Sequence, residues 1–551
     1  MPSLFQKDCA IPTPLRVVFL GDSVTDNGAF MAYMDAYFAR HLPALRPVFI
    51  NLGVSSETAA GTSEPAHPFP RPCVHDRLDQ ALERSKPDWV VICYGMNDGI
   101  YHPFSEERFD AYRAGIRRTI GHVRDAGAKA IVMTPPPFDA ASFDGNLLPD
   151  GEDQYAYFAP YVGYDDVLKR YAEWVLALGE EADGAVDIHS PLTAAVNRLR
   201  AAQPDYRSGD GIHPNADGHW VIAKTLLSRL FNITLERVPH EVAAEPPAEA
   251  AELILQRHRL LSAAWKEHVG HTNPNKADAL PLDEAIERSQ AIDARLHQLY
   301  AGEGATLETT DDWNGYARTD FYLDGRECIL IRPAHPAPGN PWIWRAEFLY
   351  DFNQADLELL RQGWHIAYCR LSHMYGCPFA VERMRAFKLY LESKYALAPK
   401  ASLFGFSRGG LYAVNYAAAY PEDVSSLYLD APVLDIRSWP AGRGDGAGST
   451  AANWEDCMAV YGLTEDMADH FTGNPLDKTA ALAAACIPVI LVAGDQDLPV
   501  PYHENGARLA RTYESLGGEI VTIVKPGVGH HPHSLEDPSP IVEFVQRHFS
   551  A

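Results

Sequence analysis

The chain has 551 residues, enough for two or three folding units, because domains typically run to about 100–200 residues. Hydrophobic residues make up 46% and charged residues 22%, which is ordinary for a soluble globular protein. The formal net charge is −26 and the acidic residues are spread along the chain, so the surface repels phosphate backbones and anionic lipid; we expect no nucleic-acid and no membrane partner.

The first residues carry no targeting signature. Residues 1–21 lack a basic segment followed by an apolar stretch and a small-residue cleavage site, and no segment of the sequence approaches the roughly 20 apolar residues of a membrane helix. These features predict a cytoplasmic protein. The eight cysteines are scattered, with no C-x-x-C pair, which predicts free thiols rather than a disulfide or zinc scaffold.

Residues 16–231 alternate between strand-like and helix-like patterns. Short β-rich runs ending in Gly or Pro lie at residues 16–21, 47–53, 89–95 and 130–136. Longer stretches with helical spacing of apolar residues lie at 105–127, 164–182 and 214–231. This alternation predicts a parallel sheet covered by helices on both faces.

Residues 236–302 differ in character from the part before them. They begin with PHEVAAEPPAEAAE and continue as two helix-like stretches, LILQRHRLLSAAWKEHV and LDEAIERSQAIDARLHQLY. Apolar residues recur at helical spacing too often for a flexible linker, so we expect a helical extension of the first domain that joins it to the second.

A second alternation of strand and helix patterns begins near residue 319. The runs DFYLDG and CILIRP predict a hairpin around the turn dipeptide Asp324-Gly325. Further strand-like runs lie at 365–370, 400–406, 425–432, 488–494 and 519–527. The predicted fold class is therefore α/β, with two tandem α/β sandwich domains at 1–235 and 303–551 joined by the helical segment 236–302.

Four motifs of the first domain fall at the ends of predicted strands or in loops. They are Gly21-Asp22-Ser23, Gly53, Gly95-Met96-Asn97-Asp98 and Asp210-Gly211-Ile212-His213-Pro214. Together they resemble the four signature blocks of the SGNH (GDSL-like) hydrolase family over about residues 15–232. The resemblance implies a flavodoxin-like parallel sheet and a serine hydrolase, since the carboxyl ends of parallel strands are where such sheets bind ligands.

The residue types in these motifs suit ester hydrolysis. Ser23 is the expected nucleophile, His213 its base, and Asp210 the carboxylate that orients the imidazole. The N–H groups of Ser23 and Gly53 and the side-chain amide of Asn97 are the expected oxyanion donors. Three neighbouring ionisable residues are expected to have structural roles: Asp22, Asp98 and His219.

The second half contains Gly405-Phe406-Ser407-Arg408-Gly409, a G-x-S-x-G motif between a strand-like and a helix-like run. With the order Ser…Asp…His, residues 319–551 resemble the α/β-hydrolase superfamily. The resemblance implies that Ser407 is the nucleophile, that Asp497 in Gly494-Asp495-Gln496-Asp497-Leu498-Pro499-Val500-Pro501 is the acid, and that His530, which follows a glycine, is the base.

Several alternatives stay open in the second half. His531 or His533 could replace His530 as base, and Asp430 at the end of a strand could replace Asp497 as acid. The expected oxyanion donors are the N–H of Arg408 and one from the loop 335–345, for which we name Trp342; this residue could equally be a pocket wall or core. The histidine run has no carboxylate or cysteine at ligand spacing, so no metal and no cofactor are predicted.

Two complete serine triads predict a bifunctional serine esterase. The resemblance of both halves to families rich in carbohydrate esterases implies a carbohydrate O-acetylesterase acting on polysaccharide-derived oligosaccharides. The aromatic and polar loop 136–163 is expected to form one wall of the first cleft or to cap it. Lipase-like, thioesterase or peptidase activity in one domain, or one non-catalytic binding domain, are the alternatives. The oligomeric state is not predicted.

Overall fold

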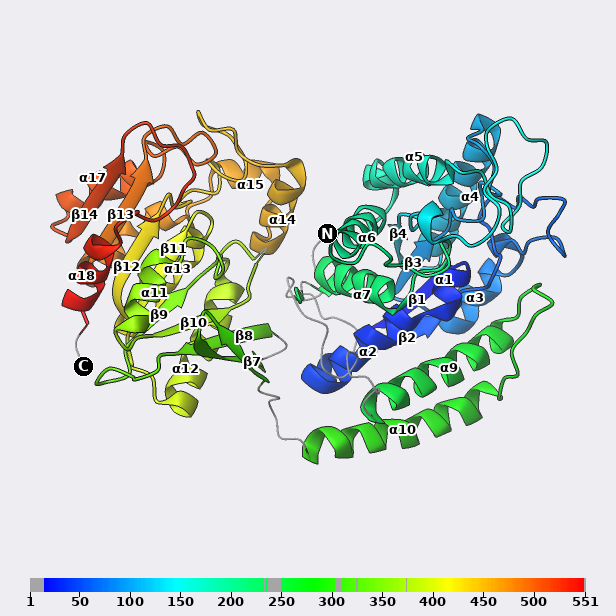
Figure 1. Ribbon diagram of the computed structural model, residues 1–551, viewed down its shortest axis with the longest axis horizontal. Coiled ribbons are helices and arrows are strands. Elements are labelled where there is room, and N and C mark those ends of the chain that lie inside the picture. The colour runs from blue at the N-terminus through cyan, green and yellow to red at the C-terminus, as the bar shows by residue number, and fades with distance from the viewer. Residues whose placement is uncertain are drawn as a thin grey trace. The chain divides into compact units, whose positions relative to one another are not determined.

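The computed structural model describes residues 14–231, 233–235, 249–302, 309–323, 326–372 and 374–549. The chain forms two compact units that divide between residues 305 and 306 (Figure 1). Each unit has its own sheet and its own hydrophobic core.

The first unit contains a five-stranded, fully parallel sheet with the order β2-β1-β3-β4-β5. Its strands are β1 (Arg16–Gly21), β2 (Val48–Asn51), β3 (Trp89–Cys93), β4 (Lys129–Met133) and β5 (Gly184–Val186). From β1 the chain adds β2 on one side of the sheet. It then crosses to the other side of β1 and adds β3, β4 and β5 in turn. The carboxyl ends of β1 and β3 therefore mark the switch point at which ligands bind in such sheets.

Helices cover both faces of this sheet, as expected for buried parallel strands. Those described are α1 (Ser23–Asn27), α2 (Ala29–His41), α3 (Leu78–Ser85), α4 (Glu106–Asp125), α5 (Tyr164–Leu176), α6 (His189–Ala202) and α7 (Ala216–Phe231). In β1, Val18 and Leu20 face the core cluster that includes side chains of α3, α4 and α5. Phe19 points to the opposite face and packs against Phe30 of α2.

The segment predicted to be a helical extension contains two helices, α9 (Glu249–Val269) and α10 (Leu282–Gly302), which pack against each other. Helix α9 also packs against α2, α3 and β2, and its Trp265 and Val269 are part of the first unit's core. The helix pair therefore packs on the first unit, next to β2, the strand that precedes Gly53.

The second unit contains a nine-stranded sheet with the order β14-β13-β12-β11-β9-β10-β8-β7-β6. Its strands are β6 (Thr309–Trp313), β7 (Tyr316–Leu323), β8 (Arg326–Arg332), β9 (Trp342–Arg345), β10 (His365–Cys369), β11 (Ala401–Phe406), β12 (Val424–Asp430), β13 (Val489–Gly494) and β14 (Ile520–Lys525). Pairing is parallel from β10 to β14 and antiparallel from β6 to β8 and between β8 and β10.

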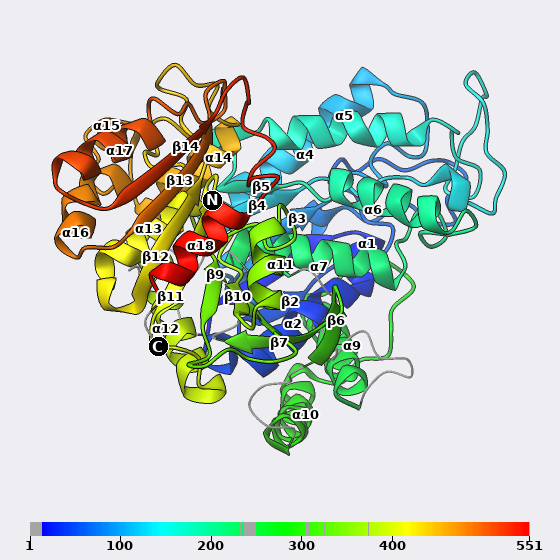
Figure 2. The ribbon, with the colours of Figure 1, turned by 60° about the vertical axis from the view of Figure 1, so that its left-hand side comes forward.

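Two core clusters sandwich this sheet. The helices of the unit are α11 (Gln354–Arg361), α12 (Pro378–Tyr395), α13 (Gly409–Ala419), α14 (Ala451–Tyr461), α15 (Glu465–Asp469), α16 (Thr479–Ala484), α17 (Gly506–Ser515) and α18 (Ser539–Arg547). Leu403 of β11 faces the cluster that includes α12, α13 and α17. Its neighbour Phe404 faces the cluster that includes α11 and α18, which lie over the other face of the sheet (Figure 2).

The predicted fold class is confirmed: the first sheet is parallel, the second is large and mostly parallel, and the two units are consistent with an SGNH domain and an α/β-hydrolase domain. Strands β5, β6 and β9 were not predicted. The turn predicted at Asp324-Gly325 lies outside the described residues, although β7 and β8 on either side of it do pair antiparallel.

Candidate active sites

The first candidate site lies at the switch point of the parallel sheet. Ser23 opens α1 directly after β1, and Asn97 follows the adjacent strand β3. His213 lies in the loop between α6 and α7, which returns to this edge of the sheet. The parallel strand order therefore brings together motifs that are up to 190 residues apart in the chain.

Ser23, His213 and Asp210 form a continuous hydrogen-bonded row. Ser23 Oγ lies 2.8 Å from His213 Nε2, and His213 Nδ1 lies 2.8 Å from Asp210 Oδ2. The second oxygen of Asp210 accepts the N–H groups of Ile212 (2.9 Å) and His213 (2.7 Å). An ionised carboxylate can only accept, so Nδ1 carries the proton and Nε2 is free to accept the serine proton.

The ionisation of this row suits a general base. Burial alone would raise the pKa of Asp210, but the hydrogen bonds from His213 and Ile212 outweigh it and hold that pKa below its usual value. Burial would lower the pKa of His213, but the hydrogen bond to Asp210 and the charges of Asp210 and Asp22 raise it above 6.5. The carboxylate would thus stabilise an imidazolium formed by transfer of the Ser23 proton to His213.

The three expected oxyanion donors differ in what they contact. Asn97 is buried; its Nδ2 donates to the carbonyl of Glu57 (3.2 Å) and its Oδ1 accepts from Tyr101 (3.1 Å). An amide has two N–H bonds, so one remains for a substrate. The N–H of Gly53 donates to Asn51 Oδ1 at 2.8 Å, a contact that no sequence motif indicates. Gly53 could therefore bind an oxyanion only if Asn51 gave way.

Glycine is required at position 53 by the close approach of two backbone segments. A Cβ atom there would lie 2.3 Å from the backbone N of Asp26 and 2.5 Å from the carbonyl carbon of Thr25, both in α1. The loop after β2 is thus pressed against the helix that Ser23 opens. A side chain at residue 53 would displace that helix.

Three ionisable residues near Ser23 have structural contacts. Asp22 is buried, accepts the N–H of Val24, and has a pKa that burial raises to about 7. Asp98 accepts the N–H groups of Ala59 and Ala60, and burial raises its pKa to about 6. Burial lowers the pKa of His219, whose ring stacks on Phe30, to about 4.

A buried ion pair that sequence reasoning missed supports Asn97. Arg77 and Glu57 are joined at 2.6 Å, with side chains 4% and 0% exposed, and Tyr94 donates a further hydrogen bond to Glu57. The carbonyl of the same Glu57 accepts from Asn97. Nothing in the sequence marks these residues, because a single Glu, Arg or Tyr outside a motif has no distinctive spacing.

The loop 136–163 adjoins two sides of the first site. The N–H of Asp139 donates to the carbonyl of Gly211 in the histidine loop, and the N–H of Tyr161 donates to the carbonyl of Tyr101, each at 2.9 Å. The loop exposes the rings of Tyr157 and Phe158, which are 39% and 53% exposed. It thus bridges the segments that carry His213 and Asn97.

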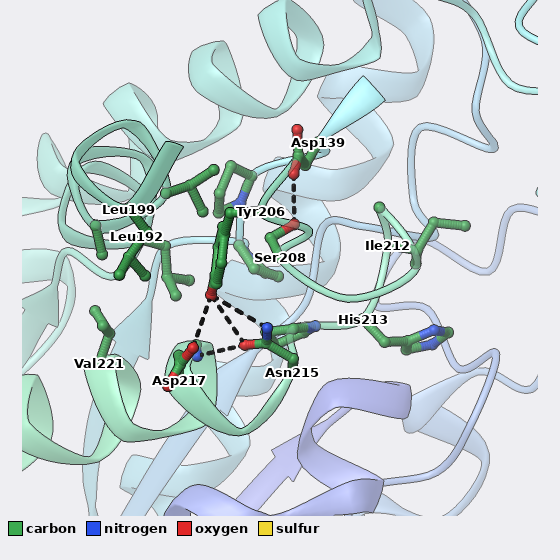
Figure 3. A pocket seen from close by; sticks show the side chains of 17 residues that line it. Asp139, Leu192, Leu199, Tyr206, Ser208, Ile212, His213, Asn215, Asp217 and Val221 are labelled. Atoms are coloured by element: carbon green, nitrogen blue, oxygen red, sulfur yellow. Dashed lines mark hydrogen bonds between the residues drawn. The ribbon is translucent and has the colours of Figure 1, made fainter. Parts of the chain in front are cut away.

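A mainly apolar pocket lies behind the histidine loop (Figure 3). Leu192, Leu199 and Val221 line one side, and Tyr206 stands over them with its hydroxyl 3.0 Å from Asp217. The imidazole of His213 points away from these apolar side chains, toward the far side of the loop (Figure 3). The pocket is therefore not the place where a substrate would meet Ser23.

The second candidate site is built on a strained turn. Ser407 follows β11 with φ = 48°, in the left-handed region that non-glycine residues rarely adopt. At Gly410 a Cβ would lie 2.6 Å from Pro432 Cβ and 2.8 Å from the carbonyl oxygen of Val433, so a glycine is needed at this position, three residues after Ser407. The strand-turn-helix arrangement from β11 to α13 is the context that a G-x-S-x-G elbow requires.

The structure brings Ser407, His530 and Asp497 together. Ser407 Oγ lies 3.0 Å from His530 Nε2, and His530 Nδ1 lies 2.7 Å from Asp497 Oδ2. The other oxygen of Asp497 accepts the N–H of Val500 at 2.8 Å. As in the first site, the serine hydroxyl contacts Nε2 of the histidine and the carboxylate contacts Nδ1.

The alternative acid and the alternative bases have other contacts. Asp430 accepts from His533 Nδ1 (2.8 Å), from the N–H of Ser534 (2.8 Å) and from the hydroxyl of Tyr428 (2.6 Å). His531 is exposed and stacks on Phe352. His530 is thus the member of the histidine run that contacts Ser407.

Our expectation for Trp342 as oxyanion donor is wrong. Residues 342–345 form strand β9, which pairs on both sides, and Ile343 aligns with Ser402 of β11. Trp342 is therefore at the amino end of its strand, about 20 Å from Ser407 at roughly 3.3 Å per residue. It is 1% exposed, and its indole N–H donates to the carbonyl of Ala398.

The loop that follows β9 lies next to the nucleophile turn instead. A Cβ at Gly409 would be 3.4 Å from Glu347 Cβ and 3.6 Å from Glu347 N. The buried carboxylate of Glu347 pairs with the guanidinium of Arg408 at 3.0 Å and accepts from Ser372. This pair fixes the loop against the turn and leaves the backbone N–H of Arg408 beside Ser407.

A protein-family model matches part of the first unit. Residues 19–221 match the model of the GDSL-like Lipase/Acylhydrolase family. The first unit contains a GDSL-like lipase/acylhydrolase domain. Both Ser23 and His213 fall within the matched residues of this GDSL-like domain. The protein is accordingly a hydrolase of the esterase type.

Individual proteins resemble each half. An acetylxylan esterase of Geobacillus stearothermophilus is 24% identical over 236 residues, which are 39% of this chain and 93% of that protein. The crystal structure of a catalytic mutant of an acetylxylan esterase from the same organism is 23% identical, covers 40% of this chain and 97% of that one, and has a TM-score of 0.30.

Solved structures similar to the C-terminal half are peptidases of the α/β-hydrolase type. One is a puromycin-hydrolyzing peptidase of Mycobacterium tuberculosis, 13% identical, with 44% of this chain and 38% of that chain covered and a TM-score of 0.32. Among the described residues, no helix combines the length and apolarity needed to cross a bilayer.

Proposed function

We propose that the chain is a bifunctional serine esterase with two independent sites, Ser23–His213–Asp210 and Ser407–His530–Asp497. The observation that supports this most directly is that each serine hydroxyl lies within 3.0 Å of an imidazole whose other nitrogen is bonded to a carboxylate. Each row presents a carboxylate, an imidazole and a hydroxyl in order. One such row is what nucleophilic ester hydrolysis needs.

In each site the proposed reaction has two half-reactions. The serine oxygen attacks the ester carbonyl while His213 or His530 takes the hydroxyl proton at Nε2, and the imidazolium then protonates the departing alkoxide. Water, deprotonated by the same nitrogen, hydrolyses the acyl-enzyme and releases the carboxylic acid. Asp210 and Asp497 keep the proton on Nδ1 and stabilise the imidazolium in both steps.

The negative charge on the attacked oxygen needs preset donors. In the first site we assign the N–H of Ser23 and the free N–H of Asn97, with Gly53 joining them if Asn51 releases it. In the second site we assign the N–H of Arg408 and, in place of Trp342, the N–H of Glu347, which lies closest to the nucleophile turn in the loop after β9.

We propose an acetylated carbohydrate as substrate of the GDSL-like domain. The similarity to an acetylxylan esterase supports this class of substrate. The exposed rings of Tyr157 and Phe158 on the loop 136–163 are suited to stack on sugar faces beside the site. We further propose that the helical segment 236–302 belongs to this domain, because α9 contributes to its core.

Single Ser23→Ala and Ser407→Ala variants and the double variant test the proposal. Each is assayed on a short-chain aryl ester and on acetylated xylo-oligosaccharides, with products identified by mass. We expect each single variant to keep part of the hydrolysis and the double variant to lose all of it. Full activity of one single variant on every substrate, with none in the other, would contradict a second site. A peptide-amide assay on Ser23→Ala tests whether the second site cleaves peptides instead.

A further inference from the structure

The histidine run after β14 forms a compact cluster in three dimensions. The ring centroids of His530, His531 and His533 are 4.8–4.9 Å apart, and the rings stand at 73–87° to one another. A ring nitrogen of each lies within 4.8 Å of a ring nitrogen of each of the others. Three imidazoles from four consecutive residues thus converge beside the hydroxyl of Ser407.

Two of these imidazoles have a buried carboxylate behind them. His530 Nδ1 is 2.7 Å from Asp497, and His533 Nδ1 is 2.8 Å from Asp430; both carboxylate side chains are 1% exposed. A carboxylate that accepts from Nδ1–H fixes the tautomer and leaves the Nε2 lone pair free. This is the outer-shell arrangement that orients histidine ligands of metal ions.

Asp430 has no part in the proposed catalytic row, although it is buried at the end of β12. Its contacts to His533, Ser534 and Tyr428 orient a histidine that does not contact the nucleophile. The ring of His533 is further held by Phe406, which stacks on it, and by Phe352, which meets it edge to face. A second Asp–His pair, as firmly positioned as the first, is unexplained by ester hydrolysis alone.

We propose that His530, His531 and His533 bind a divalent transition-metal ion such as Zn²⁺, and that the bound ion switches the second site off. The inhibitory part rests on the function proposed above for Ser407. Sequence reasoning predicted no metal because the run lacks a carboxylate at ligand spacing; the fold provides two carboxylates, from β12 and from the loop after β13, as partners of the ligands rather than as ligands.

The ligand set selects the class of ion. Neutral imidazoles suit Zn²⁺, Cu²⁺ and Ni²⁺, whereas Mg²⁺ and Ca²⁺ prefer oxygen ligands. Three histidine nitrogens that each lie 2.0–2.1 Å from a tetrahedral Zn²⁺ are about 3.4 Å apart. The nitrogens of this cluster lie within 4.8 Å of one another, so each distance between them must shorten by at most about 1.4 Å. His531 is exposed, so it can move toward the other two rings without leaving a packed core.

Inhibition follows from the nitrogen that the ion occupies. Nε2 of His530 accepts the Ser407 hydroxyl at 3.0 Å, and one lone pair cannot hold a metal ion and take that proton at the same time. A bound ion therefore removes the general base. The first site has no such cluster among the residues that the structure describes, so it is expected to be insensitive.

Binding is measured first, by calorimetric titration of ZnCl₂ into tag-free Ser407→Ala protein, with MgCl₂ as the reference ion. This variant cannot use the second site, so the result is independent of the proposed activity. We expect Zn²⁺ binding that His531→Gln weakens at least tenfold, because loss of even a residue that hydrogen-bonds to a ligand typically costs about 10–100-fold in metal affinity. The matched control is His503→Gln, which alters the other described cluster, Asp445–His503–Glu504, and should leave this affinity unchanged.

Inhibition is measured next on the Ser23→Ala protein, each rate being normalised to that protein's own metal-free rate. We expect Zn²⁺ to inhibit the Ser23→Ala protein and a chelator to restore its activity. Adding His531→Gln to this protein should make Zn²⁺ at least tenfold less potent as an inhibitor. The Ser407→Ala protein should not be inhibited. Unchanged Zn²⁺ affinity in His531→Gln, or loss of binding in His503→Gln alone, would overturn the metal site. If Ser23→Ala hydrolyses no substrate, the proposed second activity fails, while the calorimetry still decides whether the metal binds.

Discussion

His213 is positioned to act as a base only while it is neutral. In the Ser407→Ala protein, kcat/KM should rise with pH through the pKa of His213, and the hydrogen bond to Asp210 places that midpoint above 6.5. Asp210→Asn removes the charge that favours the imidazolium, so the midpoint should move to lower pH while kcat falls by roughly 10⁴-fold, as in other serine triads. Steady-state pH profiles check both effects. An unmoved midpoint in Asp210→Asn would mean that another group limits the rate.

Gly53 offers a test of how tightly the first site is built. Gly53→Ala would place Cβ 2.3 Å from the backbone of α1, so the helix that Ser23 opens must shift. We expect kcat/KM of the first site to fall by about 100-fold, the usual effect of misplacing a reacting group by about 1 Å. The control is Gly121→Ala in α4, where a Cβ would meet nothing within 4 Å. Equal activity of both variants would show that the loop after β2 has more room than the structure gives it.

The serines could be placed from the sequence because their turns are local. Glycines flank Ser407, and Gly21-Asp22-Ser23 ends an apolar strand, so the motif and its backbone geometry coincide. The choice among His530, His531 and His533 could not be made in this way. These residues lie within four positions of one another, and the path of the loop over Phe352 and Phe406 decides which ring reaches Ser407.

At the level of secondary structure, one of the strands that were not predicted, β9, led to a misplaced site residue. Residues 342–345 follow four prolines in the ten residues 332–341, and this composition predicts a loop. They form the short central strand β9 because both neighbouring strands offer hydrogen bonds to the backbone and both core clusters receive its side chains. The donor loop therefore begins after Arg345, at Ala346 and Glu347.

The loop between β2 and α3 depends on the buried pair Arg77–Glu57. Arg77→Met would leave the Glu57 carboxylate without its cation at a site 0% exposed, so the free energy of unfolding of the first unit should fall by about 3–5 kcal/mol. Urea unfolding followed by fluorescence measures the loss. The matched control is Arg117→Met, which breaks a pair whose side chains are 48% and 49% exposed and should change stability little. Similar effects of both variants would argue against burial as the cause.

For the whole molecule, the two units have separate cores and each contains a complete hydrogen-bonded row. We therefore expect two calorimetric unfolding transitions. Arg77→Met should lower one of them, by about 2–4 °C for each kcal/mol lost. Arg345→Met should lower the other, because it strips the buried Asp356 of its guanidinium partner, 3.2 Å away. A single transition that both variants lower equally would contradict separate unfolding.

One reactive serine in each unit, as proposed above, would have a stoichiometric consequence. A fluorophosphonate reagent, which phosphonylates activated serines, should add two equivalents to the intact protein and one to either alanine variant, as counted by intact-mass spectrometry. Rates measured on the unmodified chain with a substrate common to both units would then be the sum of two saturation curves. A single apparent Michaelis constant fitted to these rates would then be an average over two sites. It would describe one site only after the other had been inactivated by substitution of its serine.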